Sequence, residues 1–329
     1  MAAARFVAQR RQRGRTRGRA SSTDRRQQSR LRELRGGRGS ERDRTTHHLG
    51  SSLPGRRLVS HPWCVRWHLE FQGDDLPRAT PRHLHAAVSW LVDEDHQAPE
   101  KPWSVLPPRR SPLGGTVVEI ATLDEGAGRR LLDRARAGHG LRLGDYHLRL
   151  EQPPVPLDEA RFLPTWRSSG ADRWTLTFRS PTAISAQKKY SPWLDPSSVI
   201  RSLLLRWNAL YSPEHHLVIP EPRILSRVSV TAFSGETVDA IMYEGHHSRT
   251  GSNKNPYRGA KAALVEPHQP RIDQAFVGSM TYTCNDSHLA PLVELLFSWA
   301  PFAGIGARTT RGFGAVTVNA SQPSTRPRD

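Results

Sequence analysis

The segment Ala300–Val316, with the sequence APFAGIGARTTRGFGAV, decides how the rest of the chain is interpreted. Apolar residues before it recur at helical spacing and predict a helix from about Ser287 to Trp299, while Phe313–Val318 is typical of a strand. The segment Ala300–Val316 holds four glycines, two arginines and two threonines, and Gly314 lies within the expected strand. Glycine lets a backbone approach a bulky anion because it has no Cβ, and arginine can hold phosphate oxygens in two places at once.

Spacing alone favours a simpler interpretation, in which this loop is a tight helix-to-strand turn with solvated arginines. Known phosphate-binding motifs run from a strand through glycines into a helix. This segment runs in the opposite direction, from a helix into a strand. The order therefore argues against a Walker or dinucleotide site.

The run GIGARTTRGFG after an apolar helix resembles the C-terminal glycine-rich loop of the CRISPR repeat-processing endoribonucleases, which belong to the RAMP superfamily of RNA-binding proteins. The resemblance covers about residues 60–320. It implies two tandem ferredoxin-like domains and a loop that contacts the RNA backbone. The residues it assigns to this contact are Gly304, Gly306, Arg308, Thr309, Thr310, Arg311, Gly312 and Gly314.

Positive charge is concentrated at the N-terminus. Residues 1–57 hold 17 arginines, no lysine and four acidic residues, so they carry +13 of the total net charge of +17. The segment has few apolar residues and lacks the apolar core of a signal peptide, so we expect a disordered basic tail. Two origins stay open: a loose RNA-binding arm, or an extension from a wrongly assigned start codon.

The remaining composition indicates a soluble protein of a reducing compartment. Cys64 and Cys284 both lie in expected strands, and two cysteines define neither a disulfide framework nor a zinc site. No apolar run approaches the roughly 18 residues of a membrane span. The expected location is the prokaryotic cytoplasm, with no membrane partner.

The chain between the tails divides into two halves with one predicted order, β-α-β-β-α-β, which is the ferredoxin-like arrangement. In the first half we expect strands at 63–71, 103–106, 116–121 and 146–150, and helices at 81–92 and from 124 to about 137, the latter buried through Leu131, Leu132 and Ala135. In the second half we expect strands at 174–178, 227–233, 275–283 and 313–318, and helices at about 196–210 and 287–299. A polar insertion, residues 244–270, separates two of these strands.

The predicted fold class is therefore α+β, with two antiparallel sheets. We expect a basic tail at 1–57, an N-terminal ferredoxin-like domain at 58–152, a linker at 153–171, a C-terminal ferredoxin-like domain at 172–320 and a short tail at 321–329. Because many functions share this topology, the order of elements alone says little about activity.

The resemblance places a catalytic histidine after the first helix, shortly before a Pro-aromatic-Ser stretch. His96 matches that position, and Lys101-Pro102-Trp103-Ser104 matches the stretch. RNA can be cut without metal when its own 2′-OH attacks the adjacent phosphate, which requires a general base, a general acid and positive charge. Histidine suits either proton transfer, and Lys101 is the candidate for the charge. Without the resemblance, His96 would be one of 15 histidines on a solvated loop.

Other candidates are weaker. His83 and His85 lie at the start of the first helix, where the helix dipole disfavours the protonated form, and either is a candidate for the general acid. Lys188 and Lys189 are further RNA-binding candidates, although lysines in such loops are usually just solvated. His246 and His247 in the insertion lack the spaced partners of a metal site, so no metal is expected.

The sequence thus predicts a metal-independent endoribonuclease that needs no cofactor and cuts CRISPR precursor RNA within its repeats. The resemblance implies products with a 2′,3′-cyclic phosphate and a 5′-hydroxyl, and repeat RNA as the partner. Other subunits of a CRISPR effector complex, and the choice between monomer and homodimer, stay open. Two alternatives remain: a non-catalytic RAMP subunit that holds RNA, and an assembly protein that contacts RNA through its tail.

Overall fold

The computed structural model describes residues 62–72, 81–112, 114–143, 146–163, 166–186, 189–240 and 272–321. The expected basic tail, the insertion at 244–270, Lys188 and residues 322–329 lie outside these ranges. Within them, no helix is long and apolar enough to cross a membrane.

The N-terminal half forms a seven-stranded sheet. Five strands lie in the order β2 (Trp103–Val105), β4 (Thr116–Thr122), β1 (Trp63–Gln72), β6 (Tyr146–Leu150) and β5 (Gly140–Leu143). Two more join them, β3 (Arg109–Arg110) beside β4 and β7 (Val155–Arg161) beside β1. The helices α1 (Pro81–Val92) and α2 (Glu125–Arg134) bury apolar side chains in the core of this half.

The alternation of apolar residues in β1 sets the face that packs against these helices. Val65, Trp67, Leu69 and Phe71 are buried there, as the pattern predicts. Helix α2 begins where Asp124 Oδ1 accepts a hydrogen bond from Ala127 N at 2.6 Å. The prediction that Leu132 belongs to the core is wrong: the residue is 44% exposed, because α2 buries only the face that carries Ala127, Gly128 and Leu131.

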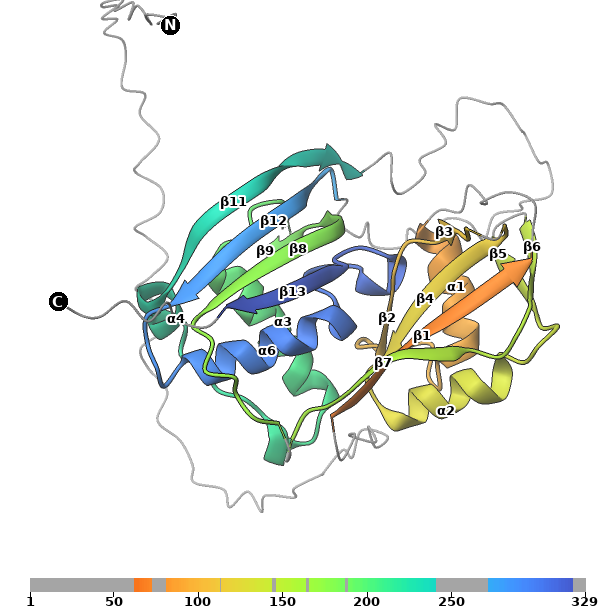
Figure 1. Ribbon diagram of the computed structural model, residues 1–329, viewed down its shortest axis with the longest axis horizontal. Helices are drawn as coiled ribbons and strands as arrows, with labels where there is room; N and C mark the ends of the chain where they lie inside the picture. The colour runs from red at the N-terminus through yellow and green to blue at the C-terminus, as the bar shows by residue number, and fades with distance from the viewer. Residues whose placement is uncertain are drawn as a thin grey trace, which may run out of the picture. The chain divides into compact units, whose positions relative to one another are not determined.

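The C-terminal half forms a four-stranded sheet in the order β11 (Val228–Asp239), β12 (Gln274–Cys284), β8 (Arg173–Thr182) and β13 (Val316–Ser321). Figure 1 shows α3 (Pro196–Leu210) and α6 (Ala290–Ala303) beside this sheet, with the short α4 (Glu221–Arg227) near one end. The pair β9 (Ile184–Ala186) and β10 (Lys189–Ser191) and two single turns, Pro213–His215 and Thr309–Arg311, complete the half.

Both sheets have the same strand order. Counting β1, β2, β4 and β6 in one half, and β8, β11, β12 and β13 in the other, the strands lie in the order second, third, first, fourth. Every pair is antiparallel. The expected linker at 153–171 contains a strand instead: β7 pairs with β1 from Arg161 opposite Trp63 to Val155 opposite His68.

The two halves share buried side chains at their junction. Cys64 on β1 and Leu123 after β4 belong to the same core as Trp207 and Trp299 of the C-terminal helices. Tyr211 links them, because its hydroxyl donates to Leu123 O at 3.0 Å and accepts from Trp299 Nε1 at 3.2 Å.

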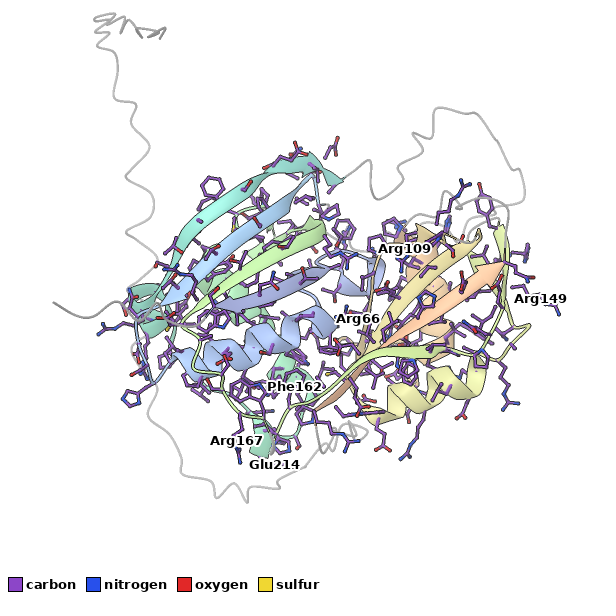
Figure 2. All side chains as sticks on the ribbon, viewed as in Figure 1. Arg66, Arg109, Arg149, Phe162, Arg167 and Glu214 are labelled. Atoms are coloured by element: carbon purple, nitrogen blue, oxygen red, sulfur yellow. The ribbon has the colours of Figure 1, made fainter. Side chains whose placement is uncertain are left out.

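Two labelled side chains in Figure 2 mark the same junction. The guanidinium of Arg66 lies 5.5 Å from the centroid of the Phe302 ring. Phe162 packs edge-on against Phe302 and Trp207, with centroids 6.2 and 6.1 Å apart. The end of α6, where the glycine-rich loop begins, is therefore packed against the N-terminal half.

Candidate active site

His85 is where the N-terminal half meets the glycine-rich loop, residues 304–315. Its ring stacks on Trp103 at 5.4 Å and 25°, and its Nδ1 lies 3.1 Å from Thr310 Oγ1 and 3.3 Å from Thr310 O. A carbonyl oxygen can only accept, so this contact favours the tautomer with the proton on Nδ1. Nε2 is then the nitrogen that can take a proton.

The surroundings of His85 lower the pKa of its imidazole. Burial lowers its pKa below the ordinary value of 6.5, and the positive charge of Arg311 lowers it further. The contact with Thr310 and the carboxylate of Asp93 act in the opposite direction but are smaller. A half-buried, neutral imidazole of this kind is suited to act as a general base at pH 7.

His96 lies beyond the end of α1, with its ring centroid 6.2 Å from that of His85. Its Nδ1 is 3.0 Å from Ser89 Oγ and 3.4 Å from Asp93 Oδ2. Because Ser89 donates its own hydroxyl proton to Asp93, its oxygen is left to accept from His96. The side chain is 64% exposed and borders a hollow of about 630 Å³ that Trp90 and Arg134 also line.

Asp93 organises the segment between the two histidines. Its carboxylate accepts hydrogen bonds from Ser89 Oγ, Trp103 Nε1 and Lys101 Nζ, the last at 2.8 Å. Burial would raise the pKa of Asp93, but these three donors, Lys101 foremost, bring it below its ordinary value. The Trp103 ring beneath His85 and the serine beside His96 are thus bonded to one buried carboxylate.

Lys101 lies inside this arrangement. Its side chain is 9% exposed, and its ammonium donates to Asp93 Oδ2, Asp95 O and His96 O, each at 2.8 Å. An ammonium has three N–H groups, so all of its donors have partners within the chain.

Lys101→Met is expected to lower the free energy of unfolding by about 3 kcal/mol, because it leaves Asp93 buried without its cation. Urea denaturation measures the change. The double variant Asp93→Asn/Lys101→Met should recover part of the loss, since it removes the buried charge as well. Lys189→Met, at an exposed lysine, is the control; an equal loss there would contradict the buried ion pair.

The glycine-rich loop owes its shape to packing within the chain. Gly306 and Gly314 have φ of +84° and +70°, where a side chain is strained. A Cβ at Gly306 would lie 2.4 Å from Ala183 O, and one at Gly314 would lie 2.0 Å from Ile305 O. At Gly304 the same position would be 2.8 Å from Thr309 Cγ2. The space that the missing side chains leave is filled by the protein itself.

Gly314→Ala is therefore expected to destabilise the protein by about 3 kcal/mol or more, through both the positive φ and the clash with Ile305 O. Urea denaturation, followed by tryptophan fluorescence, measures this. Gly140→Ala is the matched control, because a Cβ at Gly140 meets nothing within 4 Å. Equal stability of the two variants would show that the loop can rearrange.

Three cations from both halves lie close enough to act on one another; we call Arg82, Arg308 and Arg311 the arginine cluster, and Arg311 also acts on His85. Burial lowers the pKa of Arg308 and of Arg311, and the positive charges of the cluster lower both further. Arg308 has left-handed backbone, with φ of 60°, and its guanidinium lies 5.5 Å over the ring of Tyr190. Mutually repelling guanidinium groups in a half-buried place favour an anionic ligand.

The loop also borders a cleft of about 650 Å³ between the two halves. Its lining is rich in hydroxyl and guanidinium groups, among them Ser185, Ser198, Ser202, Arg201, Arg308 and Thr310. Thr309 is buried and its hydroxyl accepts a hydrogen bond from Arg206, whereas Thr310 reaches His85.

The structure brings some predicted site residues together and leaves others apart. His85, His96, Lys101, Thr310 and Arg311 are gathered around Asp93 and Trp103. His83 is exposed on α1, and Lys189 is exposed on β10 next to Tyr190. Across the described part of the chain, no group of three or more His, Cys, Asp or Glu side chains is arranged to hold a metal ion.

Sequence reasoning missed the roles of Arg82, Ser89, Asp93 and Arg206. Ser89 and Asp93 stand four residues apart at the end of α1, a spacing that places both on one helical face. Arg206 interrupts the apolar stripe of α3 between Leu203 and Trp207, which marks it as a charged group near a buried surface. Arg82 offers no such signal, because its partners in the cluster are more than 200 residues away.

The architecture is that of an α+β protein built on antiparallel sheets. A family model of the CRISPR-associated endoribonuclease Cas6 matches residues 176–316. The chain is 24% identical over 256 residues to the CRISPR-associated endoribonucleases Cas6 of two Mycobacterium tuberculosis strains, covering 73% of this chain and 72% of each relative.

Solved structures share the fold. A Cas6 with a histidine-to-alanine mutation matches with a TM-score of 0.58 at 21% identity, covering 79% of this chain and 100% of that one. A Cas6 in a substrate mimic complex gives 0.57 at 22% identity, and a Thermus thermophilus Cas6 gives 0.53 at 20%; each match covers 79% of this chain and 99% of the other. The resemblance to the Cas6 family that the glycine-rich loop indicated is confirmed.

Proposed function

We propose that this protein is an endoribonuclease that cuts CRISPR repeat RNA by attack of the RNA's own 2′-OH. The observation that carries the proposal is the pair of imidazoles 6.2 Å apart, each held through Nδ1, with Arg311 of the arginine cluster acting on His85. A base, an acid and positive charge are the three requirements of this reaction. The similarity to Cas6 proteins supports the choice of repeat RNA as substrate.

In the proposed mechanism, His85 Nε2 takes the proton of the 2′-OH as its oxygen bonds to phosphorus. The bond from phosphorus to the 5′-oxygen then breaks, and His96 in its protonated form donates a proton to that oxygen. The products are a 2′,3′-cyclic phosphate and a 5′-hydroxyl. Arg311 and Arg308 stabilise the charge of the phosphorane, and Asp93 Oδ2 lies 3.4 Å from Nδ1 of His96.

This proposal gives Lys101 a different task from the one the sequence indicated. Because its three donors bind Asp93, Asp95 and His96, we assign it to holding the loop that carries His96. The arginine cluster supplies the charge near the phosphate. The proposed mechanism gives no proton transfer to His83, which is exposed. Lys189, also exposed, remains a candidate for contact with the RNA backbone, and we make the same proposal for Lys188.

We further propose that the two halves are tandem ferredoxin-like domains, one from about residue 58 to 161 and the other from 172 to 320. The shared strand order supports this division, and β7 belongs to the first domain because it pairs with β1. The catalytic groups lie where the first domain meets the glycine-rich loop of the second.

The test uses repeat RNA with a single 2′-deoxy nucleotide at the cut, beside unmodified RNA, each with and without a chelator. We expect the unmodified RNA to be cut in both conditions and the deoxy RNA to stay intact. Cleavage of the deoxy RNA would contradict the internal attack. Loss of cutting in the chelator would contradict metal independence, and tight binding without any cutting would favour a non-catalytic RNA-binding subunit.

A further inference from the structure

Arg206 on α3 is a cation at the junction of the two halves that no carboxylate in the described ranges pairs with. Arg206 is one of the residues that line the 650 Å³ cleft, and its guanidinium Nε is buried without a hydrogen-bond partner in the part of the chain that the structure describes. Burial lowers its pKa to about 10. A shielded guanidinium in this position needs hydrogen-bond acceptors, and the acceptors that it has are all at the site.

The two terminal nitrogens of Arg206 serve different halves of the protein. Nη1 donates to Ala303 O, at the end of α6, and to Thr309 Oγ1 in the glycine-rich loop. Nη2 donates to Trp103 O at 2.9 Å and to Lys101 O at 3.3 Å, both in the N-terminal half. The planar guanidinium fork of arginine fixes these two sets of acceptors relative to each other. The ammonium of a lysine, at the end of a flexible side chain, cannot do so.

These acceptors belong to the two elements that hold His85. The indole of Trp103 is stacked under the imidazole, and Thr310, the neighbour of Thr309, contacts its Nδ1. A shift of β2 against the loop would therefore move the imidazole or break one of its two contacts.

We infer that Arg206 is a positioning residue, which sets the place of His85 between Trp103 and the glycine-rich loop without touching the RNA. The inference rests on the proposed function, because it assumes that His85 moves a proton. According to this inference, Arg206 in the C-terminal half controls the proton transfer of His85 in the N-terminal half.

The central test is Arg206→Lys, which keeps the charge but loses the fork. We expect kcat for repeat RNA to fall about 100-fold, as for a misplacement of about 1 Å, while the Kd for uncleavable 2′-deoxy RNA changes by less than about threefold. A loosened His85 is more hydrated, so its pKa rises and the acidic limb of the kcat profile moves to higher pH. The other titratable or charged groups that face His85 are Arg311 on the loop and Asp93, Lys101 and His96 in its own half, and the variant retains all four.

A second pair of variants avoids the risk that Arg206→Lys fails to fold. Thr309→Val removes one acceptor of the fork and keeps the side-chain shape, and Thr309→Ser restores the hydroxyl. We expect a loss of kcat of about tenfold in the first, as for one lost buried hydrogen bond, and recovery in the second.

Arg223→Lys is the matched control. Its guanidinium also joins two elements of the C-terminal half, through bonds of 2.9 and 3.0 Å to Asp286, but it lies away from the junction. We expect unchanged kcat and an unchanged pH profile there. If Arg206→Lys and Arg223→Lys behave alike, or if Arg206→Lys loses stability with no change in the pH profile, Arg206 is only structural and the inference is wrong.

The RNA-free protein gives an independent readout. NMR titration of the His85 ring, assigned by its disappearance in His85→Asn, should show a higher pKa in Arg206→Lys than in the wild type. A shifted titration together with a wild type that cuts no repeat RNA would contradict the proposed function and leave the positioning intact. An unshifted titration contradicts the positioning, whatever the activity.

Discussion

His85→Ala is expected to lower kcat for repeat RNA by about a thousandfold while the affinity for uncleavable RNA stays within about threefold. A positioned general base contributes on the order of 10²–10⁴ in rate, and this imidazole is held by the contact of its Nδ1 with Thr310 and by stacking on Trp103. Single-turnover cleavage and filter binding measure the two quantities separately. His288→Ala, at an exposed histidine, is the control.

The pH dependence gives the same prediction a second readout. Because the pKa of His85 lies below its ordinary value of 6.5, the neutral base predominates at pH 7. The rate should therefore stay high as the pH falls to 6.5 and decline only below it, a limb that His85→Ala should abolish. A variant that still cuts within about threefold of the wild-type rate would assign the base to another residue.

His96→Ala is expected to slow cleavage by about a hundredfold to a thousandfold, because the departing 5′-oxygen then lacks a proton donor. The decisive substrate carries a bridging sulfur in place of that oxygen, since a thiolate leaves without needing a proton. His96→Ala should cut this substrate nearly as fast as the wild type does, whereas His85→Ala should remain slow.

Cleavage of the sulfur substrate by the two variants can also show that the base and the acid are assigned the wrong way round. Rescue of His85→Ala rather than His96→Ala by the sulfur substrate would exchange the two roles. If the sulfur substrate rescues neither variant, the proton transfers are not divided between these imidazoles. His96→Gln tests whether the neighbouring Asp93 and Ser89 need a donor at this place for the loop to hold its shape.

Much of the fold could be predicted because its signal is local. Alternation in Trp63–Gln72 and helical spacing in Pro196–Leu210 are properties of single segments, and both elements were confirmed with nearly the expected bounds. The strand β7 was missed because all of its residues except Ala160 are exposed, so no buried stripe marks it, and the prolines at 153, 154 and 156 suggested a linker. Its pairing with β1 depends on a partner about 90 residues away.

The site was harder to predict than the fold. The surroundings of His85 come from Thr310 and Arg311, more than 220 residues further along the chain, so its burial and lowered pKa have no local signal. Lys101 matched a catalytic position in the sequence, but only the structure shows that its three donors are already taken. The glycines of the loop are needed for its packing within the protein. Contact of Arg308 and Arg311 with RNA stays a proposal.

The hydroxyl of Tyr211 and the apolar side chains around it, shared between the halves, bear on how this protein can be dissected. Cutting the chain after β7 would expose Cys64 and Leu123, which are packed against Trp207 and Trp299 in the intact protein. A fragment ending there would expose this apolar surface to solvent and aggregate. The intact protein should unfold on heating in one cooperative transition instead of two. Exchanging the N-terminal half for that of a relative would also require exchanging the buried residues of the C-terminal half that pack against it.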